Sequence, residues 1–150
     1  MLKRYTFWLW LAVVFQLLTA VIHALSLFVA PDPTTMSAGE RQLFDMMTNL
    51  RLDMGAGFHP SMGNLFTAVS ACYSLLCLLG GLTDIYLLRK KVEAQIVKGQ
   101  VGIQFLVFAI CFGVMVVFTF LPPIVLTGLI TFSLALSFLT NQRSHVVQDA

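Results

Sequence analysis

Four long apolar stretches, separated by short polar segments, constrain this chain more than any other feature of its sequence. They cover residues 7–30, 61–88, 101–120 and 124–139. A helix that crosses the roughly 30 Å hydrocarbon core of a bilayer needs about 20 mainly apolar residues. Only 11% of the residues are charged, whereas soluble domains average about 25%. The pattern predicts an all-α fold, a four-helix transmembrane bundle that forms a single integral membrane domain.

Prolines and charges mark the ends of these stretches. Pro60 precedes the second stretch and suits the first turn of a helix. Pro122-Pro123 is expected to stop the third span and to form a tight turn before the fourth. Lys3 and Arg4 precede the first stretch as in a signal peptide, but its apolar run is too long for one. We therefore expect the first span to be an uncleaved helix.

The basic residues predict the orientation of the spans. Seven of the nine fall on one side of the predicted membrane, namely Lys3, Arg4, Arg89, Lys90, Lys91, Lys98 and Arg143. Arg41 and Arg51 fall on the other side. The excess of lysine and arginine in cytoplasmic loops places both termini in the cytoplasm. The net charge of +2 is too small to suggest a nucleic-acid partner.

The segment between the first two spans is long for a loop without structure of its own. Ser37 and Glu40 have the spacing of a capping box, which indicates the start of a helix. An apolar stripe follows at helical spacing, formed by Leu43, Met47, Leu50 and Met54. We expect an amphipathic helix over residues 38–53 on the outer face. Its mixed charges favour a cap on the bundle over a helix that lies on the membrane surface.

Polar residues inside the spans form a candidate functional cluster, which comprises Gln16, Thr19, His23, Ser26, Asn64 and Thr67. The first four share one helical face, and the last two lie on a face of the second span. Because the two helices are antiparallel, His23 is expected roughly opposite Ser70, within about one turn of Thr67. One interpretation is that these groups only join the helices by hydrogen bonds. The other is that they contact a ligand or a proton.

His23 carries the second interpretation, since an ionisable residue inside a membrane is a functional hypothesis by default. Neutral imidazole binds metals and haem, and its ordinary pKa suits proton transfer. His59 lies near the same boundary and is a possible second contact. Haem b or quinone is therefore the alternative cofactor, although the interfacial position of His59 weakens the haem interpretation. No metal ligands and no catalytic residues are assigned.

Other polar residues near the cytoplasmic side have simpler interpretations. Asp84 is expected to be a solvated interfacial acid, or a partner of Arg89 or Lys90. Gln104 is expected to form hydrogen bonds within the bundle. The three cysteines, Cys72, Cys77 and Cys111, are interpreted as packing residues.

The sequence contains no HExxH, no nucleotide-binding glycine loop, no CxxC and no serine-nucleophile elbow. It therefore favours a non-enzymatic membrane protein, an accessory or assembly subunit or a small homo-oligomer. The partners would be the lipid bilayer and another membrane protein or a second copy. The alternative is a haem- or quinone-linked redox protein that uses His23. A small-solute channel or exporter ranks third, because the polar faces thin out towards the cytoplasmic half.

Several short motifs resemble a family of small bacterial four-helix inner-membrane proteins that has no established activity. They are His23 late in the first span, Gly55-Ala56-Gly57-Phe58, Ser61-Met62-Gly63 and Phe120-Leu121-Pro122-Pro123. The resemblance implies a bundle in the bacterial inner membrane. It implies no catalytic residues.

Overall fold

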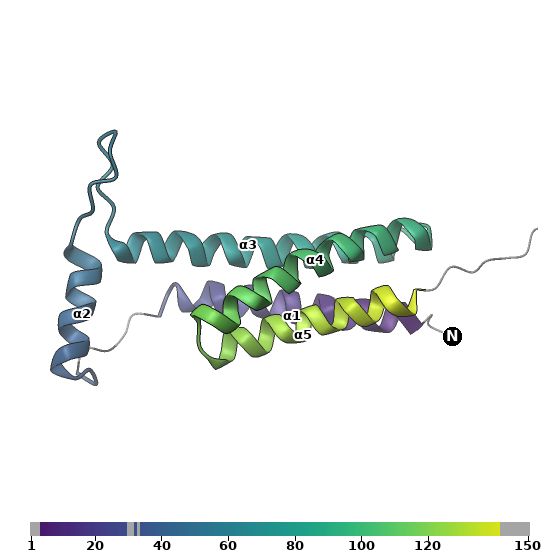
Figure 1. Cartoon of the computed structure of the whole chain (residues 1–150), viewed down its shortest axis with the longest axis horizontal. Helices are drawn as coiled ribbons and strands as arrows, with labels where there is room; N and C mark the ends of the chain where they lie inside the picture. Colours follow the sequence, from purple (N-terminus) through teal and green to yellow (C-terminus); the bar gives the residue numbers. More distant parts are fainter. Residues whose placement is uncertain (1–3, 30–31, 33, 142–150) are drawn as a thin grey trace, which may run out of the picture. The chain divides into compact units, whose positions relative to one another are not determined.

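The protein is all-helical in the part that the computed structural model describes, which is residues 4–29, 32 and 34–141. The helices are α1 (Arg4–Ser26), α2 (Ala38–Asn49), α3 (Met62–Arg89), α4 (Ala94–Phe118) and α5 (Leu121–Thr140) (Figure 1). All but α2 are long and apolar enough to cross a membrane. The all-α fold with four membrane-spanning helices is thereby confirmed. Lys3 and Arg143 lie outside the described residues, and the orientation of the spans stays a prediction.

The chain divides into two compact units, which are described separately. The first, called the bundle unit, comprises Met1–Thr19 and Cys77–Ala150. The second, called the α2 unit, comprises Ala20–Leu76. Helices α1 and α3 contribute to both units.

Three helices begin earlier than their hydropathy suggests, and the first of them, α1, begins at Arg4 rather than at residue 7 and ends at Ser26 rather than at residue 30. Helix α4 begins at Ala94 rather than at residue 101, because the polar residues of its first turns are good helix formers. Helix α5 begins at Leu121 and contains Pro122-Pro123 in its first turn. Proline fits there because the first amide groups of a helix have no partner within the helix. These prolines therefore start the fourth span instead of separating it from the third.

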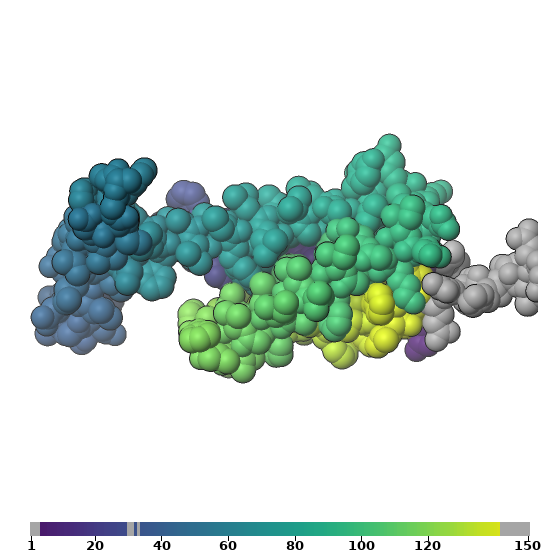
Figure 2. Space-filling view, turned by 45° about the horizontal axis from the view of Figure 1, so that its top comes forward, coloured from purple at the N-terminus to yellow at the C-terminus, as the bar shows by residue number. Residues whose placement is uncertain are grey.

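In the bundle unit, α4 and α5 pack against each other (Figure 2). Two glycines receive aromatic rings of the facing helix. A Cβ atom on Gly102 would lie 3.0 Å from a ring carbon of Phe138, and one on Gly128 would lie 3.1 Å from a ring carbon of Phe112. The missing side chains thus allow a large ring to fill the helix interface.

The buried residues are as often polar as apolar. Among the described residues, ten polar or charged side chains are buried beside ten hydrophobic ones, and many large apolar side chains are exposed. A soluble domain has the reverse distribution, with polar side chains mostly outside. The distribution fits helices that face lipid outwards and hold polar groups inwards.

In the α2 unit, helix α2 begins with the predicted capping box. Glu40 N–H donates to Ser37 Oγ (3.3 Å), and Ser37 N–H donates to the Glu40 carboxylate (2.7 Å). The helix ends at Asn49 rather than at residue 53, because Leu50 is extended and the next residues pair with the segment before α3. Leu52 N–H donates to the carbonyl of Pro60 (2.9 Å).

The paired segment from residue 51 to residue 61 reverses at Gly55-Ala56-Gly57, and all three residues have positive φ. Glycine adopts this backbone conformation without strain, unlike Ala56. The turn places Met54, which the sequence assigned to the apolar stripe of the helix, outside α2.

Candidate functional site

A hydrogen-bonded chain of three polar side chains lies inside the bundle unit. Gln16 Nε2 donates to Gln104 Oε1 (2.9 Å), and Gln104 Nε2 donates to Asp84 Oδ1 (2.9 Å). The three residues come from α1, α4 and α3. Their exposed fractions are 0% for Gln16, 7% for Gln104 and 0% for Asp84. We call these three residues the polar network.

Helix α3 provides both the acid of this network and the space for its amides. Gly80 precedes Asp84 by four residues, so both lie on the same face of the helix. A Cβ atom on Gly80 would lie 3.0 Å from Gln16 Nε2 and 3.5 Å from Gln104 Oε1. A larger residue at this position would crowd the Gln16 amide, which would have to shift, whereas its contact with Gln104 would be of ordinary length.

Two acceptors of the network have no hydrogen-bond partner in the part of the chain that the structure describes. They are Asp84 Oδ2 and Gln16 Oε1, and both atoms are buried. Buried polar atoms in proteins are nearly always paired, because an unpaired one costs about 1–3 kcal/mol. The two acceptors can therefore take a hydrogen-bond donor, a proton or a cation.

The interpretation of Asp84 as a solvated interfacial acid is wrong. Arg89 and Lys90 are exposed, whereas Asp84 is fully buried and bonded to Gln104. The reason is the helix face, because Asp84 shares the side of α3 that carries Gly80 and turns towards α1 and α4. The polar network also places polar groups in the half of the spans nearer the basic residues, where few were expected.

The structure brings His23 into contact with an aromatic residue in the α2 unit. The rings of His23 and Tyr73 meet edge to face with centroids 4.9 Å apart. Tyr73 lies about one turn beyond Ser70, which the sequence placed opposite His23. His23 Nδ1 is buried and has no hydrogen-bond partner among the described residues. Packing against the ring of Tyr73 is therefore the contact that positions the His23 side chain.

The other members of the predicted cluster are dispersed. Thr19 is buried, but its hydroxyl donates to the carbonyl of Phe15 in the same helix (2.7 Å). Ser26, Asn64 and Thr67 are exposed. Of the six residues, only Gln16 is part of the polar network. Sequence reasoning did not place Asp84 inside the bundle, whereas the expectation that Gln104 forms hydrogen bonds within the bundle is confirmed.

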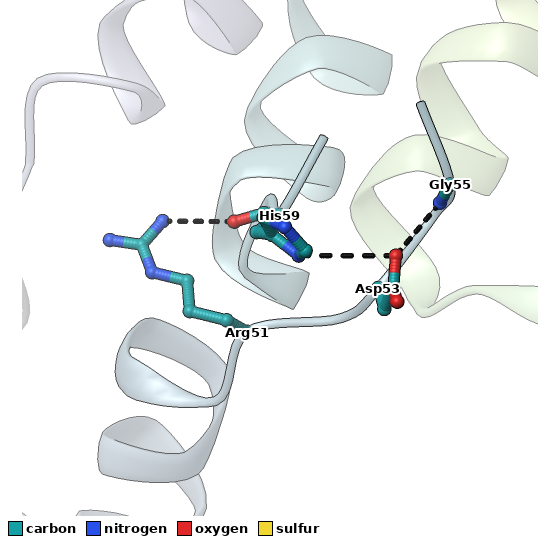
Figure 3. Close-up of polar contacts among 4 residues, drawn as sticks. All are labelled: Arg51, Asp53, Gly55 and His59. Atoms are coloured by element: carbon teal, nitrogen blue, oxygen red, sulfur yellow. Dashed lines mark hydrogen bonds and ion pairs between the residues drawn. The ribbon is translucent and has the colours of Figure 1, made fainter. Parts of the chain in front are cut away.

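His59 has different neighbours from His23 (Figure 3). Its Nδ1 lies 3.9 Å from Asp53 Oδ1, and its carbonyl accepts a hydrogen bond from Arg51 (3.5 Å). Asp53 also accepts from the backbone N–H of Gly55 (2.9 Å). His59 precedes α3, whereas Tyr73 lies roughly 16 Å along α3 from Met62 at the rise of an α-helix. The two histidines thus do not share one set of neighbours.

No group of three or more His, Cys, Asp or Glu side chains that could hold a metal ion occurs in the described ranges. The haem b and quinone alternative therefore stays a prediction that depends on His23.

A pocket of about 450 Å³ lies near the network, at the end of the bundle unit that carries the basic residues. Leu88 of α3 and Val97 of α4 contribute to its wall. Leu88 is one turn beyond Asp84, and Val97 is two turns before Gln104, on the same helix faces. Lys91 and Glu93 line the same pocket. Leu88, which lines the pocket, thus lies about one helical turn from Asp84, roughly 6 Å along α3.

Comparison with known protein families, with characterised proteins and with solved structures finds no match to this chain. Its resemblance to small bacterial four-helix inner-membrane proteins therefore stays a prediction. The polar network, with its two unpaired acceptors, is the best-defined candidate site among the described residues.

Proposed function

We propose that this four-span membrane protein is a small proton-linked transport protein of the bacterial inner membrane, in which Asp84 takes up and releases a proton. The observation that carries the proposal is the fully buried Asp84 carboxyl group, whose Oδ2 atom has no partner among the described residues. Ionisable residues inside membrane bundles commonly belong to proton relays and ion pathways. This function belongs to the channel or exporter class that the sequence alone ranked third.

A proton suits the site better than a metal ion. Calcium and magnesium ions take six or more oxygen ligands at short distance. The polar network offers two unpaired acceptors, Asp84 Oδ2 and Gln16 Oε1. A single proton needs only one acceptor, and it removes a charge that would otherwise be costly to bury.

The two amides can transmit the protonation of Asp84 to α1. In the arrangement observed, Gln104 donates to Asp84 and accepts from Gln16. A protonated Asp84 can instead donate to Gln104 Oε1. Each amide carries both a donor and an acceptor, so Gln104 would then donate to Gln16 Oε1, the atom that is unpaired now. We infer that a proton would pass between Asp84 and the solvent by way of the pocket that Leu88 lines.

Carbodiimide labelling tests the proposal. N,N′-dicyclohexylcarbodiimide enters apolar sites and modifies protonated carboxyl groups. We expect it to label Asp84 in membranes, and we expect the labelling to fall as the pH rises. Asp84→Asn keeps the size of the side chain and an acceptor for Gln104, so this variant should fold and lose the label. Mass spectrometry of peptides locates the modification, and the exposed Glu93 serves as the internal control.

Two results would contradict the proposal. One is an Asp84 that stays unlabelled at every pH while the protein is folded. The other is labelling of Asp84 by a water-soluble carbodiimide as readily as of Glu93, since that would mean a solvated group.

A specific observation also favours self-association or an accessory role. On α4, the small residues Ala109 and Gly113 are spaced as in helix-packing motifs. A Cβ atom on Gly113 would meet nothing within 4 Å among the described residues, in contrast to Gly102 and Gly128. This open strip of α4 is where a second membrane helix would fit. The outcome for Gly113→Ala, given in the Discussion, tests this role.

A further inference from the structure

Helix α2 exposes an apolar face that no described part of the chain covers. None of its residues is buried. Leu43 is 59% exposed, and Met46 and Leu50 are exposed to a similar degree. Arg41 and Asp45 project from the opposite side, since residues two apart on a helix point in nearly opposite directions. The helix is therefore amphipathic, and its apolar face is free to contact a binding partner.

The end of α2 is fixed beside the start of a membrane-spanning helix. A Cβ atom on Gly63, in the first turn of α3, would lie 3.3 Å from the carbonyl oxygen of Met47. The hydrogen bond from Leu52 to Pro60 closes the connection on the other side. Because α3 is one of the four spans, α2 ends where the chain enters the bilayer.

The direction of α2 suits the membrane surface. Within the α2 unit, α2 runs across the direction of α3 (Figure 1). A helix that lies crosswise at the end of a transmembrane helix follows the membrane plane. Interfacial helices of this kind bury their apolar face at the boundary between head groups and acyl chains.

The segments that follow α2 in the chain also expose apolar side chains. Met54 and Phe58 of the 51–61 segment are exposed, and so are Met62 and Phe66 at the start of α3. The exposed apolar side chains of α3 would face lipid in a membrane-spanning helix, and Met47 near the end of α2 lies beside the same turn of α3. The mixed charges on the polar side of α2 favour a cap on the bundle over the membrane surface, so the exposed apolar face, and not attraction to anionic head groups, has to supply the binding to lipid.

We propose that the apolar face formed by Leu43 and Met46 of α2 and by Leu50, the residue that follows the helix, docks on the lipid interface of the leaflet at which α3 begins. The partner is the bilayer itself. The attachment of α2 to two spans keeps lipid within reach at a high effective concentration, which a free protein partner would lack. The inference goes beyond the proposed transport function and does not depend on Asp84.

Tryptophan scanning of the two faces tests this inference. Leu43→Trp reports on the apolar face, and Arg41→Trp is the matched control on the opposite face. Both positions are exposed, so the larger side chain should be tolerated. Full-length protein is reconstituted in phosphatidylcholine vesicles, with and without lipids brominated near the head group. The emission of the parent protein, which contains Trp8 and Trp10, is subtracted.

We expect the added emission of Leu43→Trp to shift to the blue and to be lost in brominated lipid, while iodide in the buffer has little effect. Arg41→Trp should show the reverse pattern. If iodide quenches Leu43→Trp and brominated lipid does not, the face lies in water and the inference fails. If neither quencher reaches it, the face is covered by protein, and the inference fails in favour of a second copy or the bundle.

Discussion

The two units of this protein differ in whether their side-chain hydrogen bonds join different helices. In the bundle unit, several polar side chains bond within their own helix, as Thr19 does, but others connect residues far apart in the sequence. Gln104 joins Gln16 and Asp84, and the hydroxyl of Ser137 donates to the carbonyl of Tyr5 (3.1 Å). Each of these bonds links two different helices, so each can hold the bundle together.

In the α2 unit, most polar side chains bond within their own helix or turn. Thr48 donates to the carbonyl of Phe44 (2.8 Å), and Asn49 donates to Asp45 (2.6 Å). Such bonds cap and shape a segment without connecting it to another helix. The contrast teaches that a polar residue in a span is informative mainly when its bond crosses between helices. That criterion selects the polar network and sets aside Thr19, whose hydroxyl bonds within its own helix.

The largest change in the free energy of unfolding should follow from the loss of the Gln104 amide, which is the middle member of the polar network. Gln104→Leu removes the donor to Asp84 and the acceptor for Gln16, which leaves a buried carboxyl group unpaired. We expect a loss of about 3 kcal/mol in the free energy of unfolding. Thr48→Val, the matched change in the α2 unit, should cost only about 0.5 kcal/mol. Unfolding in mixed micelles of rising dodecyl sulfate content measures both, and equal costs would remove the distinction between the units.

A smaller difference in stability should distinguish alanine substitutions at two glycines of the bundle unit. Gly80→Ala places a methyl group 3.0 Å from Gln16 Nε2, and overpacking of this kind costs about 2 kcal/mol. Gly113→Ala meets open space, so in a monomer it should stabilise α4 by up to about 1 kcal/mol. The same micelle titration, with the mass of the detergent complex recorded, compares them. Dissociation of an oligomer by Gly113→Ala would support the accessory or self-associating role.

The smallest effect should be confined to the start of α2. Ser37→Ala removes the cap and should cost about 1 kcal/mol locally, visible as faster amide exchange in α2 with α4 unchanged. The hydrogen bond from Ser37 lowers the pKa of Glu40. Its contribution is therefore complete above the ordinary pKa of Glu40 and is lost as the pH falls through the lowered value. Amide exchange, corrected for its intrinsic pH dependence, should rise in acid for the wild type and stay level in Glu40→Ala.

Much of the fold follows from local sequence signals. Hydropathy locates the four spans, and the Ser37–Glu40 pair marks the start of α2 to the residue. The ends of helices are harder to predict from local signals, since the residues there can either continue the helix or form another structure. Asn49 ends α2 because the following residues pair with the segment before α3. The pair Pro122-Pro123 is compatible either with the end of one helix or with the first turn of the next. In the structure it lies in the first turn of α5, which packs against α4.

The candidate site could not be predicted in the same way. The position of Asp84, five residues before Arg89, is typical of an interfacial acid. Its burial depends on Gln104, which comes from the next helix, and on the space that Gly80 leaves for Gln16. No single helix contains this information, because the site arises where three helices converge. Gln16 was identified because it shares a face with His23, and Gln104 was expected to form hydrogen bonds within the bundle, but nothing in the sequence joined the two to Asp84.

Infrared titration of Asp84 tests the central claim most directly. A protonated carboxyl group has a carbonyl stretch that is separate from those of carboxylates and amides, and it shifts in heavy water. We predict one such band in reconstituted protein, lost as the pH rises, absent in Asp84→Asn and shifted in Gln104→Asn. If wild type and Asp84→Asn give the same spectrum at every pH, Asp84 neither binds nor releases a proton, and the proposed function is wrong.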